Sequence, residues 1–357
     1  MYELIISRAS PYSIKIQALL GYSGIPHRVR IQNMVSRYRV LKRLTGRTMV
    51  PVLRRGEWAL NESTEIAAYV MERSARPTLP RARGGALMAW LIEEFADEWM
   101  TRWMIQSRWD HEEDTAAVAG LLGRELLGGD LPGAERLGRL VAEQVQARLR
   151  PHGLRRENRA ALEASATRTL GALEAILSAP PAYLLEPYPT IADFGLYGPL
   201  GQYRRDPTGR RHLEAYPAVL DYVRRMDRFT ERPPGLPEEG RTDSRALMEL
   251  QPLVAELLGT HLRVLAAHLA VQDQPRAQDV EARLLDGTLF VARRSSYLQD
   301  RLGWILGRIN SAYEEGDHLF GSEGLRMESG MMQSVATLTE FPAGRAFLKD
   351  YEHLGLH

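Results

Sequence analysis

The sequence predicts an α/β domain at the N-terminus, followed by an all-helical domain and then a further helical extension. In the first 80 residues, short apolar runs alternate with amphipathic segments, which is typical of strands and helices built around one sheet. From residue 86 to 226 the pattern is almost wholly helical, and a Pro- and Gly-rich segment at 231–242 precedes the remaining residues. We therefore expect domains at 1–80 and 86–232 and an extension at 243–357.

Composition limits the class of protein. The 357 residues exceed what one domain needs, and 44% hydrophobic with 25% charged residues is a globular balance. A net charge of +1 favours neither nucleic acid nor an acidic membrane surface as a partner. The absence of cysteine excludes disulfides, thiolate-bound zinc and a cysteine nucleophile. No apolar run is long enough for a membrane span, and no leader pattern is present, so we expect a cytoplasmic protein.

Periodicity and turn residues predict the individual elements. In the first domain we expect strands at 3–7, 26–31, 50–53 and 58–60, and helices at 14–24, 35–46 and 66–72. In the second we expect helices at 86–109, 116–127, 134–149, 158–177 and 190–201. In the extension we expect one long helix at 247–265, an extended piece at 287–292, and helices at 298–309 and 331–348.

The turn at Ser10-Pro11 is the first candidate for a functional site. It follows a short apolar run and opens an amphipathic helix, for which serine suits the N-cap and proline the first helical position. The positive end of such a helix binds anions, including a thiolate. A serine hydroxyl at this end can accept a bond from the helix and still donate its proton to the anion.

Three further motifs follow in a fixed order. Val50-Pro51 opens an apolar run, Glu62-Ser63 leads into a helix, and Thr190 with Asp193 forms a capping box. Together with Ser10-Pro11 they resemble the cytosolic glutathione S-transferase family. The turn is that of its serine-type members, and the long C-terminal region resembles an extended bacterial branch. The resemblance implies a thioredoxin-like N-terminal domain and an all-α C-terminal domain.

The resemblance implies that glutathione is the co-substrate and that Ser10 is the catalytic hydrogen-bond donor to its thiol. Ser13, Ser7 and Tyr12 are alternative donors, and Tyr12 is also expected to contact glutathione. A free thiol has a pKa of about 8.5. A hydrogen bond to a charged group stabilises it by roughly 1.5–3 kcal/mol. One serine donor and a helix N-terminus are therefore enough to lower the thiol pKa by roughly one to two units.

The same resemblance implies a cis bond between Val50 and Pro51, where the backbone pairs with the extended peptide. Glu62 and Ser63 are expected to hold the γ-glutamyl end. The family's usual cation before the Val-Pro pair is replaced here by Met49. We expect Arg47, or else Arg39, to take the glycine carboxylate, unless this end is held loosely or the thiol is not glutathione.

A tryptophan- and arginine-rich helix offers candidates for the acceptor site. Trp99, Trp103, Arg108 and Trp109 fall within about three helical turns. In the family this helix lines the acceptor pocket, although a tryptophan stripe at helical spacing is also typical of a core. Tyr297, on a helix of the extension, is a further candidate for a substrate contact or a lid.

We therefore expect a glutathione-dependent transferase or isomerase that acts on a small electrophile, aromatic or anionic. The alternatives are a non-catalytic binding protein of the same family and a glutathione-dependent reductase or lyase, which the missing cysteine disfavours. The resemblance also implies a homodimer. We expect no nucleic-acid partner and no metal site, because the acidic residues beside His111 suit a helix end.

Overall fold

The N-terminal part of the chain forms a four-stranded sheet with helices on it. The computed structural model describes residues 1–81, 83–231, 243–271 and 279–295. The strands are β1 (Tyr2–Ile6), β2 (His27–Ile31), β3 (Val52–Arg55) and β4 (Trp58–Leu60), in the order β2-β1-β3-β4. β1 is parallel to β2 and antiparallel to β3, which pairs antiparallel with β4.

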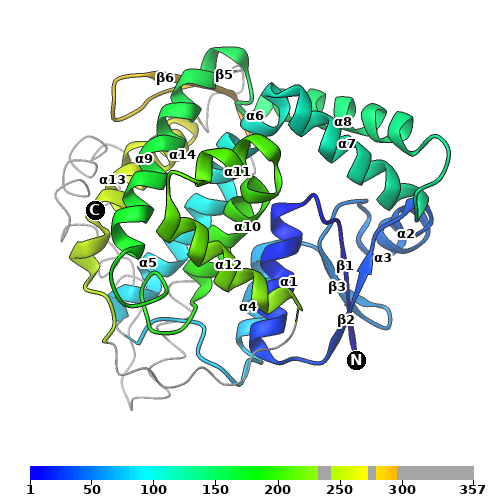
Figure 1. Ribbon diagram of the computed structural model, residues 1–357, viewed down its shortest axis with the longest axis horizontal. Helices are drawn as coiled ribbons and strands as arrows, with labels where there is room; N and C mark the ends of the chain where they lie inside the picture. The colour runs from blue at the N-terminus through cyan, green and yellow to red at the C-terminus, as the bar shows by residue number, and fades with distance from the viewer. Residues whose placement is uncertain (82, 232–242, 272–278, 296–357) are drawn as a thin grey trace.

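The helices of this domain lie within a few residues of the expected ranges. They are α1 (Pro11–Ser23), α2 (Met34–Ser36), a π-helical turn at Arg37–Leu41, α3 (Lys42–Thr45) and α4 (Ser63–Met71). Ser10 caps α1, and Gly24 ends it in the left-handed conformation at φ 68°. Figure 1 shows α1 between the sheet and the helical domain, where it packs against α10 and α12.

The second part of the chain is helical. Its helices are α5 (Arg83–Glu94), a π-helical turn at Phe95–Met100, α6 (Thr101–Asp110), α7 (Glu112–Leu127), α8 (Ala134–Leu149), α9 (Arg159–Leu177), α10 (Ile191–Arg205), α11 (Pro207–Leu213) and α12 (Pro217–Glu231), with short 3-10 turns at Arg150–His152 and Arg156–Asn158. Thr190 and Asp193 form the expected capping box at the start of α10. None of the described helices is both long and apolar enough to span a membrane.

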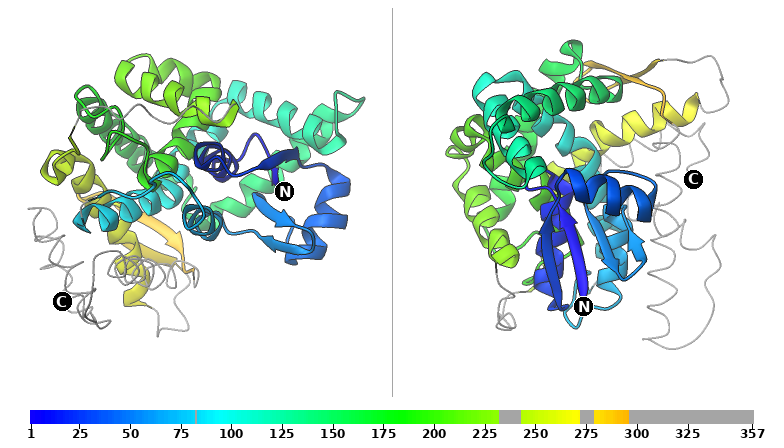
Figure 2. Two further views of the ribbon diagram at one scale, coloured as in Figure 1. Left: turned by 90° about the horizontal axis from the view of Figure 1, so that it is seen from below. Right: turned by 90° about the vertical axis from the view of Figure 1, so that its right-hand side faces the viewer.

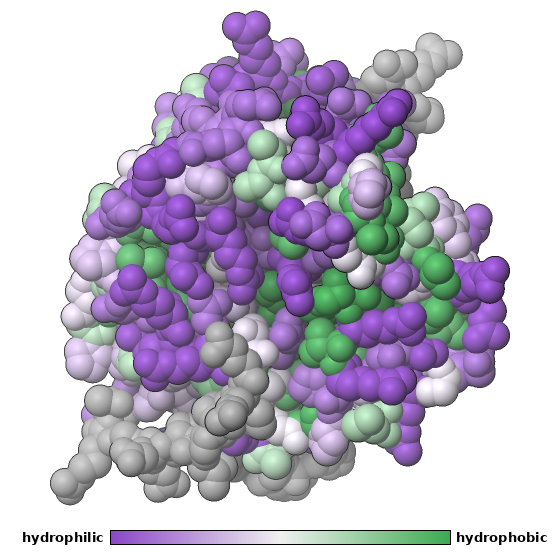
Figure 3. Space-filling model, turned by 45° about the vertical axis from the view of Figure 1, so that its right-hand side comes forward, coloured by the Kyte–Doolittle hydropathy of each residue, from purple (hydrophilic) through white to green (hydrophobic). Residues whose placement is uncertain are grey.

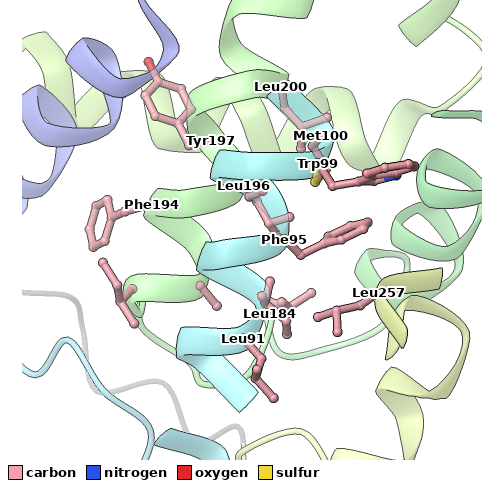
Figure 4. Close-up of a cluster of buried hydrophobic side chains, with 14 of the residues drawn as sticks. Leu91, Phe95, Trp99, Met100, Leu184, Phe194, Leu196, Tyr197, Leu200 and Leu257 are labelled. Atoms are coloured by element: carbon pink, nitrogen blue, oxygen red, sulfur yellow. The ribbon is translucent and has the colours of Figure 1, made fainter. Parts of the chain in front are cut away.

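One continuous core joins the helices. Leu91, Phe95 and Trp99 project from α5 and the π-helical turn toward Leu196 of α10 and Leu257 of the extension (Figure 4). All five side chains are almost fully buried. The helix expected at 86–109 is thus one run from α5 to α6, and its π-helical turn lies where this run crosses the core.

The extension packs on the helical domain. It contains a 3-10 turn at Leu247–Leu250, α13 (Gln251–Gly259), α14 (His261–Ala270), β5 (Asp279–Arg283) and β6 (Leu289–Arg293), and the two strands pair antiparallel. In Figure 2 it lies beside α5, in agreement with a contact of 3.2 Å between His261 Nε2 and Glu94 Oε1. The predicted fold class is confirmed, and the hairpin adds a β element to the extension.

The prediction of a single helix at 247–265 is wrong, because the helical conformation is interrupted at Thr260, between α13 and α14. Leu285, at the hairpin turn, donates its backbone N–H to the carbonyl of Gly259 at 2.8 Å. A Cβ on Gly259 would lie 2.5 Å from the Leu285 side chain, so only glycine permits this approach. The extended piece expected at 287–292 corresponds to β6. The helices expected at 298–309 and 331–348 lie outside the described residues.

The α7–α8 hairpin reaches from the helical domain over the N-terminal domain. The two helices pack closely because Gly123 faces the Ala134 carbonyl and Gly138 faces the Ala119 carbonyl, where a Cβ would lie only 1.8 Å away. Figure 1 shows the far end of the hairpin above α2 and α3. This hairpin places side chains of the helical domain at the C-terminal end of β1.

A buried ion cluster joins the two domains. Lys15 of α1 is fully buried, and its Nζ binds Glu93 of α5 and Asp97, the latter at 2.6 Å. Burial alone would lower the pKa of Lys15, but the charges of Asp97 and Glu93 outweigh this effect and raise it. Lys15 therefore stays protonated within the core, held by two carboxylates of the other domain.

Replacing Lys15 by methionine should lower the free energy of unfolding by about 3–5 kcal/mol, because it leaves two buried carboxylates without their cation. Urea unfolding at neutral pH measures this change. Lys42→Met, at an exposed lysine, is the control and should change stability little. A loss below about 1 kcal/mol for Lys15→Met would show that the cluster contributes as little as a surface ion pair.

Candidate functional site

A cavity of about 310 Å³ lies between the two domains. The N-terminal domain contributes Tyr12, Arg47, Met49, Val50, Pro51, Asn61, Glu62, Ser63 and Thr64. The helical domain contributes Asp97, Glu98, Thr101, Arg102, Ile105, Leu149, His152 and Leu154, and the extension contributes Ser295. One half of the cavity is thus built from the start of α1, the turn before β3 and the turn between β4 and α4, and the other half mainly from the π-helical turn, α6 and the turn between α8 and α9.

The structure brings together six of the residues expected at a thiol-peptide site: Tyr12, Arg47, Val50, Pro51, Glu62 and Ser63. The bond between Val50 and Pro51 is cis, as the resemblance implies. Ser63 opens α4, so the first backbone N–H groups of that helix point toward the cavity's edge. The pattern of motifs in the sequence therefore predicts which turns meet.

Ser10 lies at the N-cap of α1 but is not among the residues that line this cavity. Its Oγ accepts the backbone N–H of Ser13 at 3.2 Å, and no described residue accepts its proton. Two of the alternative donors, Tyr12 and Ser13, are less accessible to a thiol. Tyr12 lines the cavity and donates its hydroxyl to the Asp97 carbonyl oxygen at 3.2 Å, while Ser13 is fully buried.

Arg47 and Glu62 form an ion pair across the mouth of the cavity, at 2.8 Å. Their side chains are 61% and 45% exposed, so the pair contributes only about 0–1 kcal/mol. A charged ligand that offers either residue a better partner can therefore separate them at little cost.

Asp97 connects the cavity to the ion cluster. Its Oδ2 accepts the Ser63 hydroxyl at 3.3 Å and Lys15 Nζ at 2.6 Å. Glu93, the other carboxylate of the cluster, accepts the Thr64 hydroxyl at 2.9 Å. Sequence reasoning missed Lys15 and Asp97, although a lysine on the apolar face of α1 and acidic residues at i, i+4 in a tryptophan-rich helix were available signals.

The turn between β1 and α1 is held by three helices of the other domain. Glu125 of α7 accepts the Ser7 hydroxyl at 2.6 Å and the Arg8 backbone N–H at 2.7 Å. Arg108 of α6 donates to the Ala9 carbonyl at 2.9 Å, and Gln202 of α10 donates to the Arg8 carbonyl at 2.8 Å. These bonds fix the backbone that carries Ser10 and occupy Ser7, the third alternative donor.

The expected acceptor residues lie elsewhere. Trp99 is fully buried, donates its Nε1–H to Ser165 Oγ at 2.7 Å and packs on Phe290, so its contacts are those of a core residue. Trp103 is 2% exposed and meets the Tyr203 ring edge to face at 5.1 Å. Helical spacing identifies the face that these tryptophans share, but not that this face packs inward.

Arg108 and Trp109 do not line the cavity either. Arg108 is buried, with an ion pair to Asp206 at 2.8 Å and a bond to Gln202 at 2.9 Å, so its charge is already compensated. Trp109 lines a different cavity, at the end of α6. Tyr297 lies outside the described residues.

Other polar residues occupy the acceptor half of the cavity. Arg102 lies one helical turn after Glu98, with their charged atoms 3.9 Å apart, and His152 faces the same space. Partial burial and the nearby Arg102 charge lower the pKa of His152, so its imidazole is neutral near pH 7. Ile105, Leu149 and Leu154 complete this half with apolar surface.

Comparison with known families agrees with this geometry. The pattern of the glutathione S-transferase N-terminal domain matches residues 4–78, and that of the C-terminal domain matches residues 156–225. Residues 4–78 and 156–225 of the chain therefore carry the two domains of the glutathione S-transferase family. The α7–α8 hairpin falls between the two matches, and the extension follows them.

Several solved structures are similar to the chain, whereas no curated protein sequence matches it. Glutaredoxin 2 from Salmonella typhimurium, in complex with glutathione, is 18% identical over 65% of this chain and 95% of its own, with a TM-score of 0.40. The β-etherase LigF from Sphingobium sp. is 17% identical over 64% and 98%, with a TM-score of 0.46. A glutathione S-transferase from Methylobacillus flagellatus, with glutathione bound, is 15% identical over 66% and 100%, with a TM-score of 0.39.

Glu125 should make stability depend on pH. Burial raises its pKa above the ordinary value, against the opposing effect of its bonds to Ser7 and Arg8. The folded chain therefore binds the proton more readily than the unfolded chain, whose glutamate pKa is about 4.3. The protonated Glu125 side chain therefore contributes stability that is fully present below the unfolded pKa and is lost as the pH rises through the folded pKa.

Glu125→Gln should remove this dependence. As the pH rises between the unfolded and the folded pKa of Glu125, the free energy of unfolding of the wild-type should fall relative to that of the variant by at most about 1.4 kcal/mol per pH unit. Urea unfolding from about pH 4 to 7 measures this difference. Glu143→Gln, at an exposed position of α8, is the control and should stay parallel to the wild-type. Parallel curves for Glu125→Gln would contradict a raised Glu125 pKa.

Proposed function

We propose that this chain binds glutathione in the interdomain cavity and activates its thiol as a thiolate for attack on a small electrophile. The observation that carries the proposal is the convergence of Tyr12, the Val50–Pro51 turn and Glu62-Ser63 on one cavity beside the N-terminus of α1. Glutathione acts here as a co-substrate.

The γ-glutamyl end fits the Glu62-Ser63 side of the cavity. Its carboxylate suits the Ser63 hydroxyl and the N–H groups at the start of α4, since a helix N-terminus favours an anion. Its ammonium suits the carboxylates of Glu62 and Asp97. Lys15 compensates part of the Asp97 charge from behind, so the site offers a moderate rather than a full negative charge.

The glycine carboxylate is assigned to Arg47. This arginine pairs with Glu62 in the structure. Binding of glutathione would therefore exchange one exposed ion pair for two, Arg47 with the glycine carboxylate and Glu62 with the ammonium. Because exposed ion pairs contribute little free energy, this exchange orients the bound glutathione more than it raises its affinity.

Ser10 is the proposed donor to the sulfur. Its Oγ already accepts from Ser13, so the hydroxyl proton points away from the helix and is available to an anion at the end of α1. The thiolate then attacks the electrophilic carbon, the new sulfur–carbon bond forms, and the leaving group departs with its electron pair or the added electrons are protonated from solvent. Ser10 stabilises the anion and forms no covalent bond.

The acceptor occupies the half of the cavity formed by α6 and the turn after α8. Ile105, Leu149 and Leu154 suit an apolar or aromatic body, and Arg102 with His152 suits a polar or anionic substituent. The acceptor contacts are therefore assigned to these residues, in place of Trp99, Trp103 and Arg108. A cytoplasmic location and a homodimer stay predictions. Figure 3 shows that hydrophobic groups lie among the hydrophilic ones on the face it presents. Val35, Tyr38 and Met49 of the N-terminal domain are exposed.

Two measurements on the full chain test the proposal. Glutathione should bind at micromolar to millimolar strength by calorimetry, and bound glutathione should show the ultraviolet thiolate band at pH 7. Ser10→Ala should still bind glutathione but should lose most of the band, because the thiol pKa rises by roughly one to two units.

Tyr12→Phe serves as the matched comparison, because it removes a hydroxyl at the same site. Retention of the band in this variant supports Ser10 as the donor, whereas its loss would transfer the role to Tyr12. Absence of glutathione binding by the wild-type would reject the proposal as a whole. Binding without any thiolate would favour a non-catalytic binding protein.

A further inference from the structure

A second cavity, of about 480 Å³, lies at the C-terminal end of α6. The last turn of α8 and the start of α9 close its other sides. Leu149 and Leu154 line both this cavity and the interdomain one, so the turn between α8 and α9 is the wall that separates them.

Four arginines line the second cavity, and two of them are already paired. Arg155 forms two bonds with Asp279 of β5, at 2.9 and 2.7 Å. Arg159 pairs with Asp110 at 2.5 Å. These pairs hold the rim of the cavity, and the partner carboxylates compensate the charges of both arginines.

The other two arginines, Arg150 and Arg156, are exposed and form no ion pair with any residue that the structure describes. They lie on either side of the Leu154 turn, one after α8 and one before α9. Glu157 is the one carboxylate of the lining that is not held by a described arginine. The cavity therefore carries an excess of positive charge on two planar, bidentate donors.

The floor of the cavity is apolar and aromatic. Trp109 is half-buried there, beside Leu149 and Leu154. Gln106 is 9% exposed, and its Nε2 is held by both oxygens of Asp110 at 2.8 Å, while its Oε1 has no partner among the described residues. A flat aromatic ring suits the tryptophan and leucine surface.

We propose that this cavity is a second small-molecule site, which binds an aromatic carboxylate. Arg150 and Arg156 bind the carboxylate, since guanidinium groups match its two oxygens, and Trp109 contacts the ring. A single negative charge fits better than the two of a phosphate, because Asp110 and Glu157 also face the cavity. The site is independent of glutathione and does not depend on the activity proposed above.

The probe is 2-naphthoate, titrated into the full chain by calorimetry at low salt. We expect measurable binding of 2-naphthoate, and much weaker binding of the neutral analogue 2-naphthalenemethanol and of inorganic phosphate. The double variant Arg150→Met, Arg156→Met should bind 2-naphthoate at least about tenfold more weakly, because two charge-assisted contacts are lost.

The matched control is Arg136→Met, Arg139→Met, which removes two exposed arginines of α8 that do not line the cavity. It should bind 2-naphthoate as the wild-type does. Saturating glutathione should also leave the affinity unchanged. Equal loss in both double variants, binding of the neutral analogue as tight as that of 2-naphthoate, competition by glutathione, or no binding of 2-naphthoate would each overturn the proposal.

Discussion

Lys15 carries its charge into the interface between the two domains, where its side chain is fully buried. Such a charge is tolerated only when opposite charges surround it, and Glu93 and Asp97 provide them from the helical domain. The cluster therefore fixes how the α/β domain sits on the helices. Because Asp97 also accepts the Ser63 hydroxyl, the same interaction fixes one wall of the interdomain cavity.

The β1–α1 turn depends on the helical domain in a second way. Its backbone and Ser7 are bound by Glu125, Arg108 and Gln202, which come from three different helices. Glu125 lies on the α7–α8 hairpin, between the two regions that match the glutathione S-transferase family. The position of Ser10 in this chain is thus determined partly by residues outside those matches.

The fold and half of the site were predictable because their signals are local. Ser10-Pro11, the capping box at Thr190 and the Val50-Pro51 turn each depend on neighbours within a few residues, and all three were found at their expected places. The partners of Lys15 and Glu125 are about eighty or more residues away along the chain, so no periodicity indicates them. Trp99 and Arg108, expected at the acceptor site, do not line the interdomain cavity. Spacing gave no sign of this, since it shows which side chains share a face but not what that face contacts.

The most direct test of the account is a crystal structure of the chain with glutathione. We expect the sulfur within hydrogen-bonding distance of Ser10 Oγ, the γ-glutamyl group at Ser63, and Lys15 still bound to Asp97. A glutathione molecule outside the interdomain cavity, or one whose sulfur faces away from the end of α1, would contradict it.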